Sequence, residues 1–269
     1  MKLGYFKSIL ILTLFLILNV IISFLLQFFL ELNFYSYELF KLLLSLTFII
    51  PSIVIYIIFK SYVHFNIYLI KNLTIYFIIF FLSLSLQIIG TVIEVWSMSF
   101  IPENYKNYYD LLKDMLLPKN DLDLFLSLIT IGIIAPLCEE FLFRGLILEN
   151  LYRNYNAWFS NIFQAILFGI AHMNPFQFLY AIPIGFLLGW FYIKTKNLWI
   201  PISIHIFTNS IAILFSSIET NHSFFKKILH FGEDAESIND LPIEPIFFAF
   251  FMIIISFLLI PKLGKKESY

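Results

Sequence analysis

The sequence predicts an all-α polytopic membrane protein with about eight transmembrane helices and an interfacial amphipathic helix. Apolar residues make up 60% of the 269 positions and charged residues only 13%, and the mean hydropathy is +0.88. A soluble domain is about half apolar and about a quarter charged, so this chain has too few charged side chains to cover a soluble surface. The apolar residues also gather in runs of about 20, the length that crosses the hydrocarbon of a bilayer.

Eight apolar runs are long enough to be considered as spans. Lys2 and Lys7 precede the first run, which is longer than the apolar core of a signal peptide and lacks a small-residue cleavage site. We therefore expect the first run to be retained as a transmembrane helix. No soluble domain fits between the runs. The expected spans are 8–30, 38–59, 73–96, 124–150, 157–173, 176–194, 198–216 and 244–261.

The connection 102–123 carries a helical pattern of its own. Charged residues fill one face of this pattern, and Pro118 ends it. The opposite face is apolar and consists of Tyr108, Leu111, Leu112, Met115 and Leu116. Such a pattern predicts an amphipathic helix that lies at the membrane surface. The alternative interpretation is a solvated loop.

We expect one integral membrane domain in three parts. Residues 1–122 hold the N-terminal membrane helices and the interfacial helix, 123–216 form a core with unusual polar residues, and 217–269 hold an outer loop, the last helix and a basic tail. Lys and Arg are more numerous in the connections on the side of the N-terminus, which predicts cytoplasmic N- and C-termini. The net charge of −1, without a basic patch, argues against a nucleic-acid partner and leaves the lipid bilayer as the expected surroundings.

The fourth span contains three charged residues that an apolar segment should not carry. Glu139, Glu140 and Arg144 lie within an otherwise apolar run. A charge at this depth costs at least about 2.5 kcal/mol, so it normally faces a bundle interior or a watery cavity. Because Glu140 and Arg144 are four residues apart, they share a helix face and can pair. Glu139 points elsewhere and is left for another partner, which makes it the functional candidate.

Three polar residues of later spans are candidate partners for Glu139. His172 lies toward the end of the fifth span, while His205 and Asn209 lie four residues apart on the seventh. At 1.5 Å per helical residue, all of them fall at a similar depth, so they could converge near the middle of the membrane. The alternative is that each side chain only makes a hydrogen bond between helices.

These residues carry a resemblance to a known family. Glu139-Glu140-x-x-x-Arg144, Phe168-x-x-x-His172 and His205-x-x-x-Asn209, in this order on successive spans, resemble the three motifs of the CPBP (CAAX protease and bacteriocin-processing, or Abi) family. These are intramembrane endopeptidases of the type II CAAX prenyl endopeptidase kind. The resemblance covers about 70 residues and makes 123–216 the expected catalytic core. The first half of the chain contributes only its apolar character.

The resemblance implies hydrolysis of a peptide bond within the membrane. Eukaryotic relatives remove the last three residues of prenylated proteins, and bacterial relatives are associated with immunity to bacteriocins. Carried over position by position, Glu139 and His172 would activate a water, and His205 and Asn209 would stabilise the oxyanion. Glu140 and Arg144 would support the site. The expected substrate is a membrane-associated protein or peptide, with or without a lipid, at the plasma membrane of a bacterium.

The sequence is compatible with a site that binds a divalent metal and with one that does not, and with more than one class of protein. Glu139, His172 and His205 could form a three-ligand zinc site, as expected of a metalloprotease, but the sequence lacks H-E-x-x-H, and the same residues can act without a metal. A non-enzymatic membrane partner that confers bacteriocin immunity or regulation is the main alternative. A proton-coupled carrier would use the same acid and histidines as a relay, but no duplicated half supports it.

Overall fold

The computed structural model describes residues 4–33, 37–59, 65–100, 102, 105–106, 118–217, 231 and 237–265. Within these residues the secondary structure is entirely helical. The helices are α1 (Gly4–Asn33), α2 (Tyr37–Phe59), α3 (Leu73–Met98), α8 (Ala157–Ala171), α9 (Pro175–Thr195), α10 (Trp199–Ser217), the short 3-10 helix η4 (Ile238–Asp240), α12 (Ile243–Lys265) and one compound helix, Asp121–Tyr152. This confirms an all-α architecture with a helix at each of the eight expected spans.

Six of the helices are long and apolar enough to cross a bilayer, judged by length and composition among the described residues. The remaining two apolar stretches are shorter, at Leu43–Phe59 within α2 and at Ala157–Ala171 in α8. The outermost helices expose apolar side chains, such as Phe24 on α1 and Phe251 on α12. Such a surface suits hydrocarbon rather than water, because in water it would be an aggregation site.

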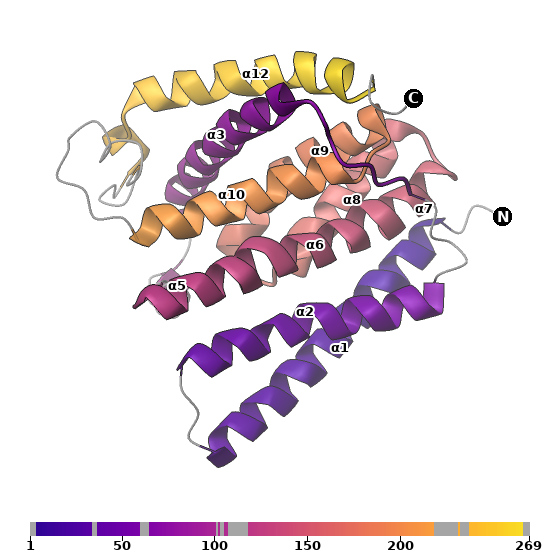
Figure 1. The fold of residues 1–269 in the computed structure, drawn as a ribbon, viewed down its shortest axis with the longest axis vertical. Helices are drawn as coiled ribbons and strands as arrows, with labels where there is room; N and C mark the ends of the chain where they lie inside the picture. The colour runs from indigo at the N-terminus through magenta and orange to yellow at the C-terminus, as the bar shows by residue number, and fades with distance from the viewer. Residues whose placement is uncertain are drawn as a thin grey trace.

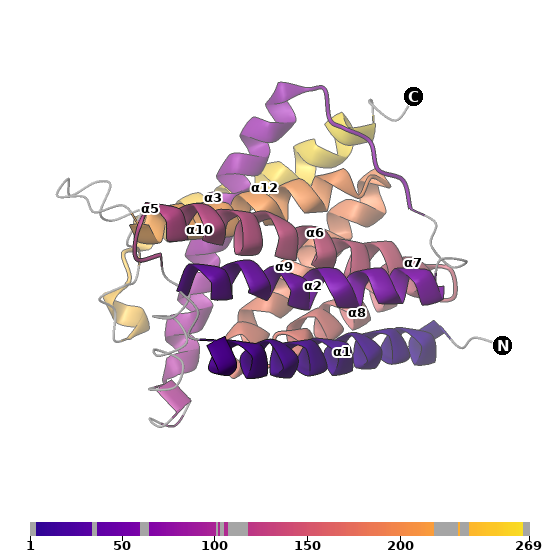
Figure 2. The same ribbon diagram turned by 60° about the horizontal axis from the view of Figure 1, so that its bottom comes forward.

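The helices pack as layers around the compound helix (Figures 1 and 2). The α1–α2 pair lies on one side and the α3–α12 pair on the other, with α10 and the compound helix between them. Helices α8 and α9 pack closely together behind these two (Figure 1). The start of α1 and the end of α12 lie at the same end of the bundle in both views.

Asparagines begin four of the helices. The side-chain oxygens of Asn72, Asn120, Asn156 and Asn174 accept hydrogen bonds from backbone N–H groups in the first turns of α3, the compound helix, α8 and α9. The first four N–H groups of a helix have no partner within it, and asparagine is among the best residues to satisfy one of them. The caps at Asn120 and Asn156 fix where the compound helix and α8 begin, and these two helices carry Glu139, Glu140, Arg144 and His172.

The compound helix contains two π-helical segments between its α-helical ones. It runs through α5 (Asp121–Ser127), the π-helix η2 (Leu128–Ile134), α6 (Ala135–Glu140), the π-helix η3 (Phe141–Leu148) and α7 (Glu149–Tyr152). The six-residue segment α6, which ends in the two glutamates, is therefore flanked by π-helix on both sides. Such π-helical turns are rare and frequently occur at functional sites.

Two glycines of α9 allow α8 to approach closely, as their small-xxx-small spacing predicts. A β-carbon at Gly185 would lie 2.9 Å from the ring of Phe168, and one at Gly189 would collide with the side chain of Asn161. No larger residue fits at either position without a shift of α8. The expected interfacial helix falls mostly in 103–117, of which only Tyr105 and Lys106 are among the described residues.

Candidate functional site

A fully buried ion pair lies at the centre of the compound helix. Arg144 Nη1 donates to Glu140 Oε1 at 2.7 Å, and neither side chain is exposed. The guanidinium also donates from Nη2 to the backbone carbonyl of Gly185 at 3.0 Å and lies 4.7 Å from the centre of the Phe168 ring. Because a buried charge is tolerated only when it is paired and hydrogen-bonded, Glu140 and Arg144 stabilise one another here.

A polar cluster on α8 completes the surroundings of Arg144. Gln164 Nε2 donates to the Gly185 carbonyl at 2.9 Å, the same oxygen that Arg144 uses, and to Asn161 Oδ1 at 3.0 Å. Asn161 in turn donates to the carbonyl of Phe186 at 2.9 Å. Sequence reasoning missed these two side chains. Their signal is visible in retrospect as an amide pair at a three-residue spacing in an apolar helix.

His205 of α10 connects the two glutamates. Its Nδ1 lies 2.8 Å from Glu140 Oε1 and its Nε2 lies 3.9 Å from Glu139 Oε2. Because Glu140 is paired with a guanidinium as an acceptor, the proton of a neutral His205 belongs on Nδ1, and Nε2 then carries the lone pair. The imidazole is 8% exposed, so its orientation is fixed by this contact and by packing against Phe168.

Glu139 differs from its neighbour in that, among the described residues, no Lys or Arg side chain forms an ion pair with it. Its side chain is 16% exposed, and its Oε2 has no hydrogen-bond partner among the described residues. The 3.9 Å to His205 Nε2 is too long for a direct hydrogen bond, but a water bonded to both atoms fits this separation. One carboxylate is thus neutralised inside the protein while the other faces the candidate site.

His172 ends α8 and lies beside the same aromatic ring as His205. Its Nδ1 is 2.9 Å from the carbonyl of Phe168. A carbonyl only accepts, so Nδ1 carries the proton and Nε2 is left as the acceptor of a neutral ring. The imidazoles of His172 and His205 make edge contacts with the Phe168 ring, at 4.9 Å and 5.9 Å between ring centres. Phe168 therefore positions both histidines as well as Arg144.

Asn209 contacts the compound helix one turn beyond His205. Its Nδ2 donates to the backbone carbonyl of Ile131 at 3.1 Å. Asn209 therefore joins α10 to η2, while His205 joins α10 to α6. Direct contacts link the four residues Glu139, Glu140, Arg144 and His205, whereas His172 is connected through Phe168 and Asn209 through the backbone of the compound helix.

The placement of these residues does not form a three-ligand metal site. Among the described residues no three His, Cys, Asp or Glu side chains come close enough together to hold a metal ion. Nδ1 of His205 is engaged by Glu140, and Nδ1 of His172 by its own helix. Glu139 and His205 Nε2 remain as a pair, one ligand short of the three that catalytic zinc sites use. We therefore assign no chemical step to a metal.

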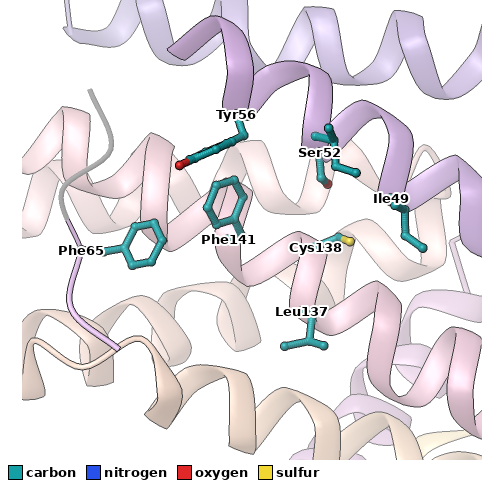
Figure 3. A pocket seen from close by; sticks show the side chains of 8 residues that line it. Ile49, Ser52, Tyr56, Phe65, Leu137, Cys138 and Phe141 are labelled. Carbon is teal, nitrogen blue, oxygen red and sulfur yellow. The ribbon is translucent and has the colours of Figure 1, made fainter. Parts of the chain in front are cut away.

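An apolar groove of about 440 Å³ opens beside α6, on the side of α2 (Figure 3). Cys138, the residue before Glu139, faces Ser52 across it, and Phe141 packs edge-on against both Tyr56 and Phe65. The residues that line it are Ile49, Ser52, Ile53, Tyr56, Phe65, Leu137, Cys138 and Phe141. The groove thus places apolar surface next to the backbone of the candidate acid.

A second buried ion pair, which the sequence did not reveal, ties α2 to the start of the compound helix. Lys41 Nζ lies 2.7 Å from Asp123 Oδ1 and donates to Ser127 Oγ at 2.9 Å, and both charged side chains are almost fully buried. Lys41 lies near the start of the expected span 38–59, and the sequence indicates no partner for it. Its partner lies on a different helix, far along the chain, so no local pattern indicates the pair.

Comparison with known proteins gives a match to one family model and to two curated proteins, the latter over about a third of the chain. Residues 121–211 match the family model described as type II CAAX prenyl endopeptidase Rce1-like. The protein named "Putative membrane peptidase YdiL" of Bacillus subtilis (strain 168) is 32% identical over 89 residues, which are 33% of this chain and 36% of that protein. An Escherichia coli protein named "Uncharacterized 24.3 kDa protein" is 34% identical over 100 residues, 35% of this chain and 45% of that protein.

The matches confirm the resemblance inferred from the three motifs, all of which lie inside 121–211. The chain spans less than half the length of either curated relative. No solved structure matches the chain.

Proposed function

We propose that this protein is an intramembrane endopeptidase, on the premise that its residues 121–211 match the type II CAAX prenyl endopeptidases. The observation that carries the proposal is the contrast between the two adjacent glutamates. Glu140 is neutralised by Arg144, whereas Glu139 has an oxygen without a hydrogen-bond partner among the described residues, 3.9 Å from an imidazole nitrogen. Such an acid in an apolar span needs a functional reason, and hydrolysis supplies one.

In the proposed reaction a water is activated between Glu139 and the histidines. The Glu139 carboxylate accepts a proton from the water as the water oxygen attacks the carbonyl carbon of the scissile peptide bond. His172 assists through Nε2, which is its free acceptor because Nδ1 is held by the Phe168 carbonyl. The proton then passes to the amide nitrogen as the C–N bond breaks, and a carboxylic acid and an amine leave.

We assign the negative charge of the tetrahedral intermediate to His205 and Asn209. Asn209 uses one N–H for the Ile131 carbonyl, and its second N–H is left to donate to an oxyanion. His205 donates from Nε2 only when both of its nitrogens carry protons, with Nδ1–H directed at Glu140. Removal of one such donor typically costs about 10²–10³ in kcat.

Glu140 and Arg144 support the site without touching the substrate. Arg144 donates a hydrogen bond to Glu140, and Glu140 contacts Nδ1 of His205. These contacts orient the imidazole so that its other nitrogen, Nε2, points toward Glu139. A carboxylate that orients a functional imidazole in this way recurs in many hydrolytic sites.

The substrate in this proposal is a protein or peptide at the bilayer. The groove is apolar and is lined by Cys138, the residue before Glu139, so it offers a place for an aliphatic segment or for the lipid of a lipidated peptide. With an even number of spans we propose that both termini are cytoplasmic, because the Lys and Arg residues favour that side. A bacterial plasma membrane is the location that fits this orientation.

The test compares the peptides that accumulate in cells carrying the wild-type protein or Glu139→Gln. We expect at least one membrane or secreted peptide to lose its cleaved form in Glu139→Gln and in His172→Ala, with kcat on that peptide lowered about 10²-fold or more. Glu149→Gln is the matched control, because Glu149 belongs to the same compound helix but bonds Tyr192 and Arg153 instead.

Wild-type cleavage in both site variants would refute the mechanism. If Glu139→Gln also preserved a biological effect such as bacteriocin immunity, the non-enzymatic partner would become the better explanation.

A further inference from the structure

The backbone of the compound helix has a carbonyl without its usual donor, two turns before Glu139. In an α-helix the Ile131 carbonyl would accept from residue 135, and in a π-helix from residue 136. The Ala135 N–H instead bonds the Thr130 carbonyl. Residue 136 is proline and has no N–H. Neither helical pattern therefore satisfies the Ile131 carbonyl.

Asn209 supplies the missing donor from another helix. Its Nδ2 lies 3.1 Å from the Ile131 oxygen. An unpaired backbone carbonyl inside a membrane protein costs several kcal/mol, so this hydrogen bond satisfies a real requirement of the π turn. The next residue, Gly132, lets α10 come close, because a β-carbon there would lie 2.9 Å from Ser210 Oγ.

The π turn also determines how the two ends of the compound helix are rotated relative to each other. Before the turn, Asp123 and Ser127 are held to α2 by Lys41. After the turn, Glu140 is held to α9 through Arg144 and to α10 through His205. A π turn, with its hydrogen bond between residues i and i+5, contains about one residue more than an α turn. If η2 returned to α-helix, α6 would therefore rotate relative to α5 by roughly 100°.

We propose that Asn209 and Pro136 together form a positioning device: they stabilise the π turn of η2 and thereby orient Glu139 toward His205. Pro136 removes the donor that would close the turn, and Asn209 replaces it from α10. The device rests on the proposed function, since it positions the acid of that site. Asn209 thus acts in two ways, through the Ile131 carbonyl and through its second N–H.

The device predicts that the two residues are coupled. In Pro136→Ala the new N–H, or that of Ala135 after a return to α-helix, satisfies the Ile131 carbonyl, so the Asn209 contact becomes redundant. Asn209→Ala should therefore disturb α6 in the wild-type background and have little further effect in the Pro136→Ala background. An Asn209 that acts only as an oxyanion donor would show the same loss in both.

Cys138 gives a readout that needs no substrate, because it is the one cysteine of the chain and lies on α6 beside Glu139. We would measure its alkylation rate by N-ethylmaleimide in the full-length, detergent-purified protein. Asn209→Ala should change the rate by about threefold or more through a rotation or loosening of α6. In the Pro136→Ala background, adding Asn209→Ala should change the rate by less than that.

Thr208→Val is the matched control, since the Thr208 hydroxyl donates within α10, to the Ile204 carbonyl. It should leave the alkylation rate unchanged. If Asn209→Ala fails to fold, Pro136→Ala/Asn209→Ala should still fold, because the carbonyl is then satisfied. Equal alkylation rates in the wild type and Asn209→Ala, or an Asn209→Ala effect of the same size in both backgrounds, would overturn the proposal.

Once a cleaved peptide is known, kcat can be compared in the wild type, Asn209→Ala, Pro136→Ala and the double variant as a second test of the coupling. Asn209→Ala should lower kcat by more than about 10³-fold in the wild-type background, because the positioning contact and the oxyanion donor are both lost. In Pro136→Ala only the oxyanion donor is lost, so the factor should be smaller, about 10²–10³. Multiplicative losses would overturn the positioning role while leaving Glu139 as the base. A failure of the endopeptidase mechanism itself would appear instead as activity in Glu139→Gln, with the Cys138 result unaffected.

Discussion

Replacement of Arg144 by methionine tests whether the buried charges are organised as described. Arg144 and Glu140 are both without solvent exposure, and the guanidinium makes one hydrogen bond to Glu140 and one to the Gly185 carbonyl. In Arg144→Met the Glu140 carboxylate keeps only His205 as a neighbouring donor among the described residues. Loss of one partner from a buried ion pair typically costs about 3–5 kcal/mol, because the other charge is left uncompensated.

The assay is thermal or denaturant unfolding of the purified protein in one detergent, with Glu140→Gln/Arg144→Met as the matched comparison. The amide oxygen that Glu140→Gln introduces can still accept from His205 Nδ1, and the double variant contains no unpaired charge at this position. Replacement of a whole buried pair by neutral residues is often close to neutral. We therefore expect the double variant to recover most of the stability lost in Arg144→Met.

Two results would refute this reasoning. Wild-type stability in Arg144→Met would mean that Glu140 does not depend on the guanidinium. A double variant as unstable as the single one would mean that Arg144 contributes through its packing on Phe168 and its bond to Gly185, rather than through charge.

Two further predictions concern the packing of α9 and the role of metals. Gly189→Ala should destabilise the protein by about 1–3 kcal/mol, because its β-carbon would collide with Asn161. Gly90→Ala is the control, since nothing lies within 4 Å of the added atom; it should leave the stability unchanged or raise it by up to about 1 kcal/mol, because alanine has the higher helix propensity. Equal unfolding midpoints for the two variants would contradict the α8–α9 packing. Chelation should leave peptide cleavage unchanged, because no three His, Cys, Asp or Glu side chains among the described residues come close enough together to hold a metal ion. Stoichiometric zinc lost together with activity would contradict this.

The positions of the spans could be predicted from the sequence alone. A bilayer admits only segments that satisfy their own backbone hydrogen bonds, so an apolar run of about 20 residues has few alternatives to a helix. Each of the eight expected runs is a helix in the structure, with ends that differ by a few residues. Some ends differ because the capping residue lies outside the apolar run, as Asn120 does.

Part of the candidate site could also be predicted from the sequence. Glu140 and Arg144 pair because residues four apart share a helix face, whatever the rest of the fold does. The order of the three motifs placed His172 and His205 on later spans at a similar depth. This information is local or concerns only the order of elements, which is why it could be inferred before the structure.

Only the tertiary structure decided which side chains meet. Helix rotation is set by packing against neighbours, and the π turns of the compound helix break the regular step of about 100° on which a sequence argument relies. Hence the contact of His205 with Glu140, the link from Asn209 to the Ile131 carbonyl and the burial of Lys41 on Asp123 could not be anticipated. Each joins residues at least 65 positions apart, and spacing along the chain says nothing about such pairs.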